Sequence, residues 1–181
     1  MQKTEQITLQ RQEKDKFFKH SPYAPLSPEQ QAKFDGLRYF DPNPALAFEL
    51  KAEPFADQKH VQMQTSTGEV RTYLRWGQVK FPVDGQEATL TLYFQPGQED
   101  FFLPFTDSTS GDETYGAGRY LEVKRLPDGK VRLDFNDAYN PYCAYGPNWS
   151  CPIPPAENRL KVPIRAGEKT PGEAWSAYHE E

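Results

Sequence analysis

Along EATLTLYFQ, residues 87–95, every second side chain is apolar, namely Ala88, Leu90, Leu92 and Phe94. Successive side chains of a strand point to opposite faces, so this period of two predicts a strand with one face in a core. Similar runs occupy residues 61–66, 69–76 and 79–83. Short segments containing Gly68 and Gly85 separate these runs, which predicts two β-hairpins.

The same rhythm extends along most of the chain. It begins at residues 46–53, after a proline-rich segment, and returns at 119–126 and 130–135, which flank the turn residues Pro127, Asp128 and Gly129. Short strands separated by turns are typical of all-β folds. We therefore expect a mainly β fold, either an antiparallel β-barrel or a β-sandwich, and we favour the barrel because long loops could close its mouth.

Helices are expected only near the N-terminus. Residues 6–19 are charged and rich in glutamine, with Phe17 and Phe18 at the end that would dock. Ser27, Pro28 and Gln30 then supply an N-cap, a first-turn proline and a capping-box partner for a short helix ending at Gly36. We expect a single β-rich domain over residues 1–169 with this N-terminal helical segment, followed by a C-terminal tail, 170–181.

The charge pattern excludes several classes of partner. The formal net charge is −5 and no run of lysine and arginine exceeds two residues, which argues against nucleic acid and against an anionic membrane surface. No stretch is apolar enough to cross a bilayer, and the N-terminal residues lack the apolar core of a signal peptide. A cytoplasmic location is the expectation.

Two segments, 105–118 and 136–159, interrupt the strand rhythm and are too long for hairpin turns. Long loops inside a compact domain are often functional. We predict that the loops 104–119 and 136–159 close, with the 132–136 strand, around a pocket for a small polar ligand. The candidate ligand-binding residues are Tyr115, Arg119, Asp134, Asn136, Tyr139, Asn140, Glu157 and Asn158.

The same residues allow structural readings of about equal weight. The carboxylates and Arg119 could pin a loop, the 132–136 polar face could meet water, and the aromatic side chains could fill a core. Two other functions stay open. A hydrolase could use a pair among Asp107, Glu113, Asp134 and Glu157. Alternatively, the proline- and aromatic-rich loop could be a protein-interaction surface.

The sequence does not tell which cofactor, if any, the protein uses. Cys143 and Cys151 match none of the short zinc motifs, and His20, His60 and His179 lie far from them, so we expect no metal site. In a reducing cytosol both cysteines are expected as thiols. The chain has no GxSxG turn, dinucleotide glycine motif or P-loop. The oligomeric state is not predicted.

Four stretches carry a resemblance to a known family: FLPFTDSTSGDETYGAGRYL, LDFNDAYNPYCAY, CPIPPAENRL and IRAGEK. Together with FDGLRYF at residues 34–40, they resemble the motifs of the domain-of-unknown-function family 1684, over nearly the whole chain. The resemblance implies membership in a widespread family of bacteria and archaea that has no established activity. It therefore carries over no catalytic residues.

Overall fold

A computed structural model describes residues 4–172 and Trp175. Two helices come first, α1 (Thr4–His20) and α2 (Pro28–Lys33). The seven strands are β1 (Ala47–Lys51), β2 (Glu53–Gln64), β3 (Val70–Val83), β4 (Gln86–Phe94), β5 (Phe101–Phe105), β6 (Arg119–Arg125) and β7 (Lys130–Asp134). Single 3-10 turns are η1 (Pro44–Leu46), η2 (Pro127–Gly129), η3 (Phe135–Asp137), η4 (Tyr142–Ala144) and η5 (Ala156–Asn158).

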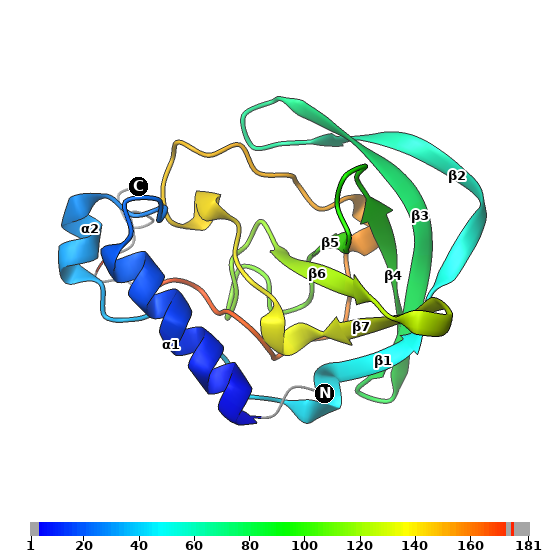
Figure 1. Ribbon diagram of the computed structural model, residues 1–181, viewed down its shortest axis with the longest axis horizontal. Helices are drawn as coiled ribbons and strands as arrows, with labels where there is room; N and C mark the ends of the chain where they lie inside the picture. The colour runs from blue at the N-terminus through cyan, green and yellow to red at the C-terminus, as the bar shows by residue number, and fades with distance from the viewer. Residues whose placement is uncertain (1–3, 173–174, 176–181) are drawn as a thin grey trace.

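The strands form one antiparallel sheet that curls into a half-barrel. Their order is β1-β7-β6-β5-β4-β3-β2, and Figure 1 shows the helices on the opposite side of the molecule from β2 and β3. The prediction of a mainly β, barrel-like fold with an N-terminal helical segment is confirmed. β1 and β2 lie at the two ends of the strand order, yet only Ala52 separates them in sequence.

The expected pair of hairpins is wrong in one respect. Residues 69–76 and 79–83 belong to one long strand, β3, which pairs with both β2 and β4. The pairing register with β4 shifts between Arg75 and Gly77, so Trp76 is the extra residue of a β-bulge. The neighbouring Gly77 leaves no room for a side chain, because a Cβ at this position would lie 2.4 Å from the Glu53 carbonyl oxygen. The bulge interrupts the alternation of apolar side chains along β3, so its sequence resembles that of two separate strands.

The helix signals are confirmed with two adjustments. Ser27 and Gln30 form the predicted capping box at α2, with the Ser27 hydroxyl accepting from the Gln30 N–H at 3.2 Å. α2 ends at Lys33, ahead of Gly36. α1 buries Ile7 as well as Phe18, so it docks near both ends and not only at its C-terminal end.

Two clusters of buried side chains hold the layers together. The sheet core consists of inward residues such as Leu90, Leu103 and Leu133, none of which is exposed to solvent. The second cluster joins the helices to the 142–145 turn. Trp175 belongs to it, packing edge-on against Phe34 at 4.9 Å between ring centroids. The other residues of the predicted tail beyond Gly172 lie outside the described part of the chain.

Asn158 closes a gap between β4 and β5, which share only the residue pair Tyr93 and Phe102. Its Oδ1 accepts from the Thr91 N–H at 2.8 Å, and its Nδ2 donates to the carbonyls of Thr91 at 3.0 Å and Pro104 at 2.9 Å. Its side chain is fully buried. One amide group therefore replaces the ladder bonds that the diverging strands cannot make.

We expect Asn158→Ala to lower the free energy of unfolding by about 2–4 kcal/mol, because it leaves buried backbone groups of Thr91 and Pro104 unpaired. Urea denaturation checks this, with the exposed Asn148→Ala as control. A midpoint equal to that of the control would contradict the role given to Asn158.

Candidate functional site

The structure distributes the eight sequence-predicted residues over several places, and most of them make internal contacts. Arg119 is 1% exposed and donates to the carbonyls of Ile164 at 2.8 Å and Glu168 at 3.2 Å, as well as to that of Ala166. Its Nη2 also lies 3.6 Å from the Asp107 carboxylate. Arg119 therefore fastens the 164–168 segment to the sheet.

Asp134 and Asn136 form a second internal unit at the end of β7. The Asp134 Oδ1 accepts from the backbone N–H and the side-chain amide of Asn136, at 3.0 and 2.9 Å. The Asn136 side chain in turn pairs with both backbone groups of Asn43, at 2.7 and 2.9 Å. Both predicted residues are buried, and they join β7 to the segment that leads into β1.

The remaining predicted residues lie in other parts of the fold. Tyr115 belongs to the second cluster of buried side chains, which joins the helices to the 142–145 turn. Asn140 donates to the Lys169 carbonyl at 3.0 Å and to the Tyr145 hydroxyl at 3.2 Å. Glu157 forms a two-pronged salt bridge with Arg75, at 2.8 Å for the shortest contact, and accepts from the Tyr93 hydroxyl.

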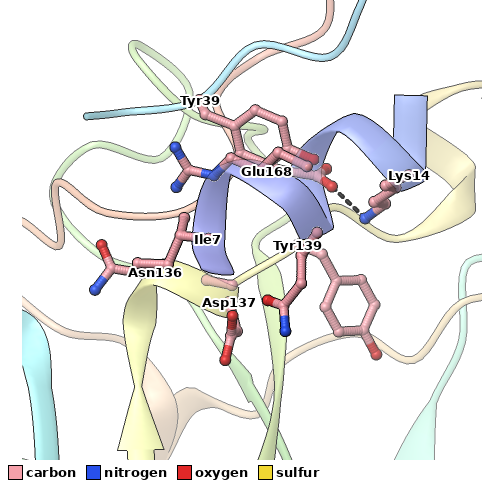
Figure 2. A pocket seen from close by; sticks show the side chains of 10 residues that line it. Ile7, Lys14, Tyr39, Asn136, Asp137, Tyr139 and Glu168 are labelled. Atoms are coloured by element: carbon pink, nitrogen blue, oxygen red, sulfur yellow. Dashed lines mark hydrogen bonds and ion pairs between the residues drawn. The ribbon is translucent and has the colours of Figure 1, made fainter. Parts of the chain in front are cut away.

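Tyr139 differs from the other predicted residues because it lines two hollows. One is a groove of about 640 Å³ on the outer face of the sheet. We call it the outer-face groove; its aromatic floor comprises Tyr73, Phe102, Tyr120 and Tyr139. The other is a pocket of about 120 Å³ beneath α1, in which Figure 2 shows the ion pair between Lys14 and Glu168.

Strand alternation explains the aromatic floor. On β6, Leu121 and Val123 enter the core, so Tyr120 and Glu122 point to the other face. The ring of Phe102 stacks on that of Tyr73 at 5.5 Å and meets that of Tyr120 edge-on at 4.9 Å. Tyr120 meets the Tyr139 ring at 5.8 Å. Rings that contact one another in this way form a stiff apolar surface.

The turn between β4 and β5 forms one wall of the groove. Pro96 and Gly97 occupy its two central positions, Gly97 has a φ of +90°, and the Gln98 N–H donates to the Gln95 carbonyl at 3.1 Å. This is the sequence and geometry of a type II turn, which needs a residue of positive φ at the glycine. The turn brings Glu99 and Asp100 to the rim.

Glu122 is the carboxylate next to the aromatic floor. It accepts a hydrogen bond from the Tyr139 hydroxyl at 2.6 Å. Its side chain reaches solvent through the groove, but the surrounding walls exclude enough water to raise its pKa above the ordinary value, and the nearby charge of Asp100 adds to the rise.

Among the residues that the structure describes, Arg71 is the only basic side chain lining the groove. Its Nη2 donates to the Ser150 carbonyl at 2.7 Å. It also neighbours the Tyr73 hydroxyl, whose pKa is raised by burial and lowered in part by Arg71. The guanidinium therefore holds the 150–152 segment beside the groove.

The cysteines lie close to this segment and are free thiols in the structure. The Cys143 thiol donates to the Trp149 carbonyl at 3.1 Å and contacts the Ser66 hydroxyl at 3.2 Å. Burial raises the pKa of the Cys151 thiol to about 12, and the neighbouring Cys143 thiol adds to the rise. Cys151 is therefore a weak nucleophile at neutral pH.

Within the described residues, no three histidine, cysteine, aspartate or glutamate side chains are grouped so as to hold a metal ion. In that same part of the chain, no helix is both long and apolar enough to cross a membrane.

Comparison with known proteins places the chain in a family. Residues 32–169 match the family model described as "Protein of unknown function (DUF1684)". The chain belongs to the DUF1684 family. This confirms the resemblance carried by the loop motifs, several of whose residues, including Arg119 and Asn158, make the internal contacts described above.

A solved structure supports the same fold. It is the solution NMR structure of an uncharacterised protein from Haloarcula marismortui, 38% identical, with a TM-score of 0.70 and with 92% of this chain and 93% of that chain covered. A search of curated proteins finds no significant match. The comparisons thus supply family and fold without an activity.

Sequence reasoning missed Phe102, Tyr120 and Glu122. A usable signal was present, because alternation on the 119–126 strand puts Tyr120 and Glu122 on the face opposite the core. Large aromatic side chains on such a face are unexpected if it only meets water. What the sequence did not supply was the strand order that brings Tyr73, Phe102 and Tyr120 together.

The raised pKa of Glu122 predicts a pH-dependent stability. A carboxyl whose pKa is raised in the folded protein stabilises it while protonated, and this contribution is lost as the pH rises through the folded-state pKa. We expect the melting temperature of Glu122→Gln to exceed that of the wild type by a margin that grows from about pH 4, near the ordinary glutamate pKa, towards neutrality.

Thermal unfolding across this pH range checks the expectation, with Glu87→Gln as the control. Glu87 is exposed on β4 and is not among the described residues that line the groove. A margin that stays constant with pH would contradict the prediction.

Proposed function

We propose that this protein binds a small, ring-bearing polar molecule in the outer-face groove. The observation that carries the proposal is the combination of size and lining. The groove measures about 640 Å³, within the range of small-molecule sites, and such sites combine apolar and aromatic walls with a few polar groups that orient the ligand. The four floor rings and Glu122 supply this combination.

The proposal keeps the predicted class of ligand and changes its position. The sequence-based pocket lay between the 132–136 strand and the two long loops. Of its eight residues, Tyr139 lines the groove, whereas Arg119 and Asn158 are engaged with backbone groups. The 136–159 loop still takes part, because it supplies Tyr139 and Pro152.

The geometry gives less support to the hydrolase alternative. Asp107 accepts from the Ile164 N–H at 2.6 Å and faces Arg119. Glu113 pairs with Arg165 at 3.0 Å, and the contacts of Asp134 and Glu157 are internal as described. These carboxylates are thus held by partners on their own chain, which favours structural roles over acid–base work.

The interaction-surface alternative has only scattered support. The large apolar side chains exposed near the proline-rich loop are Trp149, at 36%, and Ile153, at 44%. The Trp149 ring packs on Tyr142 at 5.0 Å between centroids. Isolated apolar residues of this kind are normal on a monomer surface.

A library of ring-containing fragments tests the proposal by ¹H–¹⁵N NMR. We expect the hits to shift the backbone amides of Gly97, Phe102 and Glu122. Phe102→Leu keeps the apolar volume but removes a flat face, and should weaken these hits by about fivefold, given that ring contacts contribute roughly 1 kcal/mol.

Tyr23→Leu is the matched control, since Tyr23 is 82% exposed and outside the groove. Hits that cluster elsewhere, or that bind Phe102→Leu as well as the wild type, would overturn the placement of the site.

A further inference from the structure

The outer-face groove is lined by more acidic than basic side chains. Within residues 4–172 and Trp175, its acidic lining residues are Glu99, Asp100 and Glu122, and its one basic lining residue is Arg71. The positive charge of Arg71 lies against the Ser150 carbonyl at 2.7 Å. The groove therefore presents an excess of negative charge beside a floor of aromatic rings.

Glu157 and Glu122 lie near opposite ends of one row of residues across the sheet, and they differ in whether a basic side chain neutralises their charge. Tyr93 pairs with Phe102, and Phe102 pairs with Glu122, along one row of the sheet. At the Tyr93 end of this row, Arg75 forms a salt bridge with Glu157 at 2.8 Å. Glu122 forms no salt bridge with any residue that the structure describes. Its negative charge is thus available to a ligand.

The Tyr139 ring, beside Glu122, already contacts a cation. Lys14 Nζ already lies 5.2 Å from the centroid of the Tyr139 ring, so this ring accepts a positive charge. Lys14 lines the small pocket under α1 and not the groove, and it is paired with Glu168. Tyr139 itself lines the groove as well as the small pocket.

We propose that the ligand of the outer-face groove is an organic cation, a small amine or quaternary ammonium compound that also carries a flat ring. Its ring packs on Phe102 and Tyr120, and its ammonium lies between the Tyr139 face and the Glu122 carboxylate. Aromatic faces attract cations through the ring quadrupole, and a neighbouring carboxylate adds charge pairing. This inference rests on the proposed function and adds the chemical class of the ligand.

Three probes of similar size separate the classes: benzylamine, which is a cation at neutral pH, benzyl alcohol and benzoate. We expect benzylamine to bind on the order of tenfold more tightly than benzyl alcohol, and benzoate to bind most weakly, because its charge meets Glu99, Asp100 and Glu122. NMR titrations that follow the amides of Gly97 and Phe102 measure the dissociation constants and locate each probe.

Glu122→Gln tests the pairing directly. The amide keeps an oxygen that accepts from the Tyr139 hydroxyl but removes the charge, so the preference for benzylamine over benzyl alcohol should fall to about twofold. Glu87→Gln, with the same chemical change outside the groove, should keep the full preference. Rising salt should reduce the preference as well, since the charges are partly exposed.

The preference should also weaken as the pH falls and Glu122 takes up its proton. The charged and titratable groups facing it are Asp100, which raises its pKa, and Lys14 and Tyr139, which lower it. In Glu122→Gln the pH dependence of the preference should be smaller than in the wild type, because the glutamine side chain has no proton to take up at this position.

The results distinguish an error in the chemical class of the ligand from an error in the position of the binding site. Equal binding of benzyl alcohol and benzylamine, with shifts at Gly97 and Phe102, overturns the cation class and leaves groove binding intact. An unchanged preference in Glu122→Gln also overturns it. Absence of groove shifts with all three probes overturns the inference too, whereas the proposed function is judged by the wider fragment library.

Discussion

A buried guanidinium organises this protein. Arg119, at the start of β6, donates to three carbonyls of the segment 164–168 and faces the Asp107 carboxylate. Burying a charge is costly unless hydrogen bonds and an opposite charge compensate it, and here both are supplied. Removing one partner of such a pair typically costs about 3–5 kcal/mol, because the other charge stays behind.

The segment held by Arg119 attaches the helices in turn. Its Glu168 is 1% exposed and accepts from Lys14 of α1, from the Asn140 N–H at 3.0 Å and from the Tyr145 hydroxyl at 2.6 Å. Burial and the neighbouring Glu168 charge raise the pKa of Tyr145 well above its ordinary value, so its hydroxyl stays a donor. The contacts run from sheet to C-terminal segment to helix, and they place Tyr139 between the small pocket and the groove.

The sequence predicted those features that depend on neighbouring residues. The alternation of residues 87–95, the capping box at Ser27 and the turn at Pro127 are local, and each appears in the fold. Asn158 and Arg119 were predicted as ligand-binding residues, whereas in the structure their side chains hydrogen-bond to backbone groups of residues distant in sequence. A motif rich in polar residues looks the same whether it binds a ligand or fastens a fold, and only the strand order distinguishes the two.

The position of Ala52 has a consequence for how the chain acquires this shape. Because β1 and β2 lie at opposite ends of the sheet, β1, the first strand in sequence, pairs with β7, the last, through contacts such as that of Ala47 with Asp134. Contacts so distant in sequence slow folding, since the entropy of the intervening chain must be lost first. During synthesis β1 leaves the ribosome long before β7, with its backbone edge unpaired. Glu49 and Lys51, which are exposed on β1, place charges on that edge and disfavour pairing with the wrong strand in the interval.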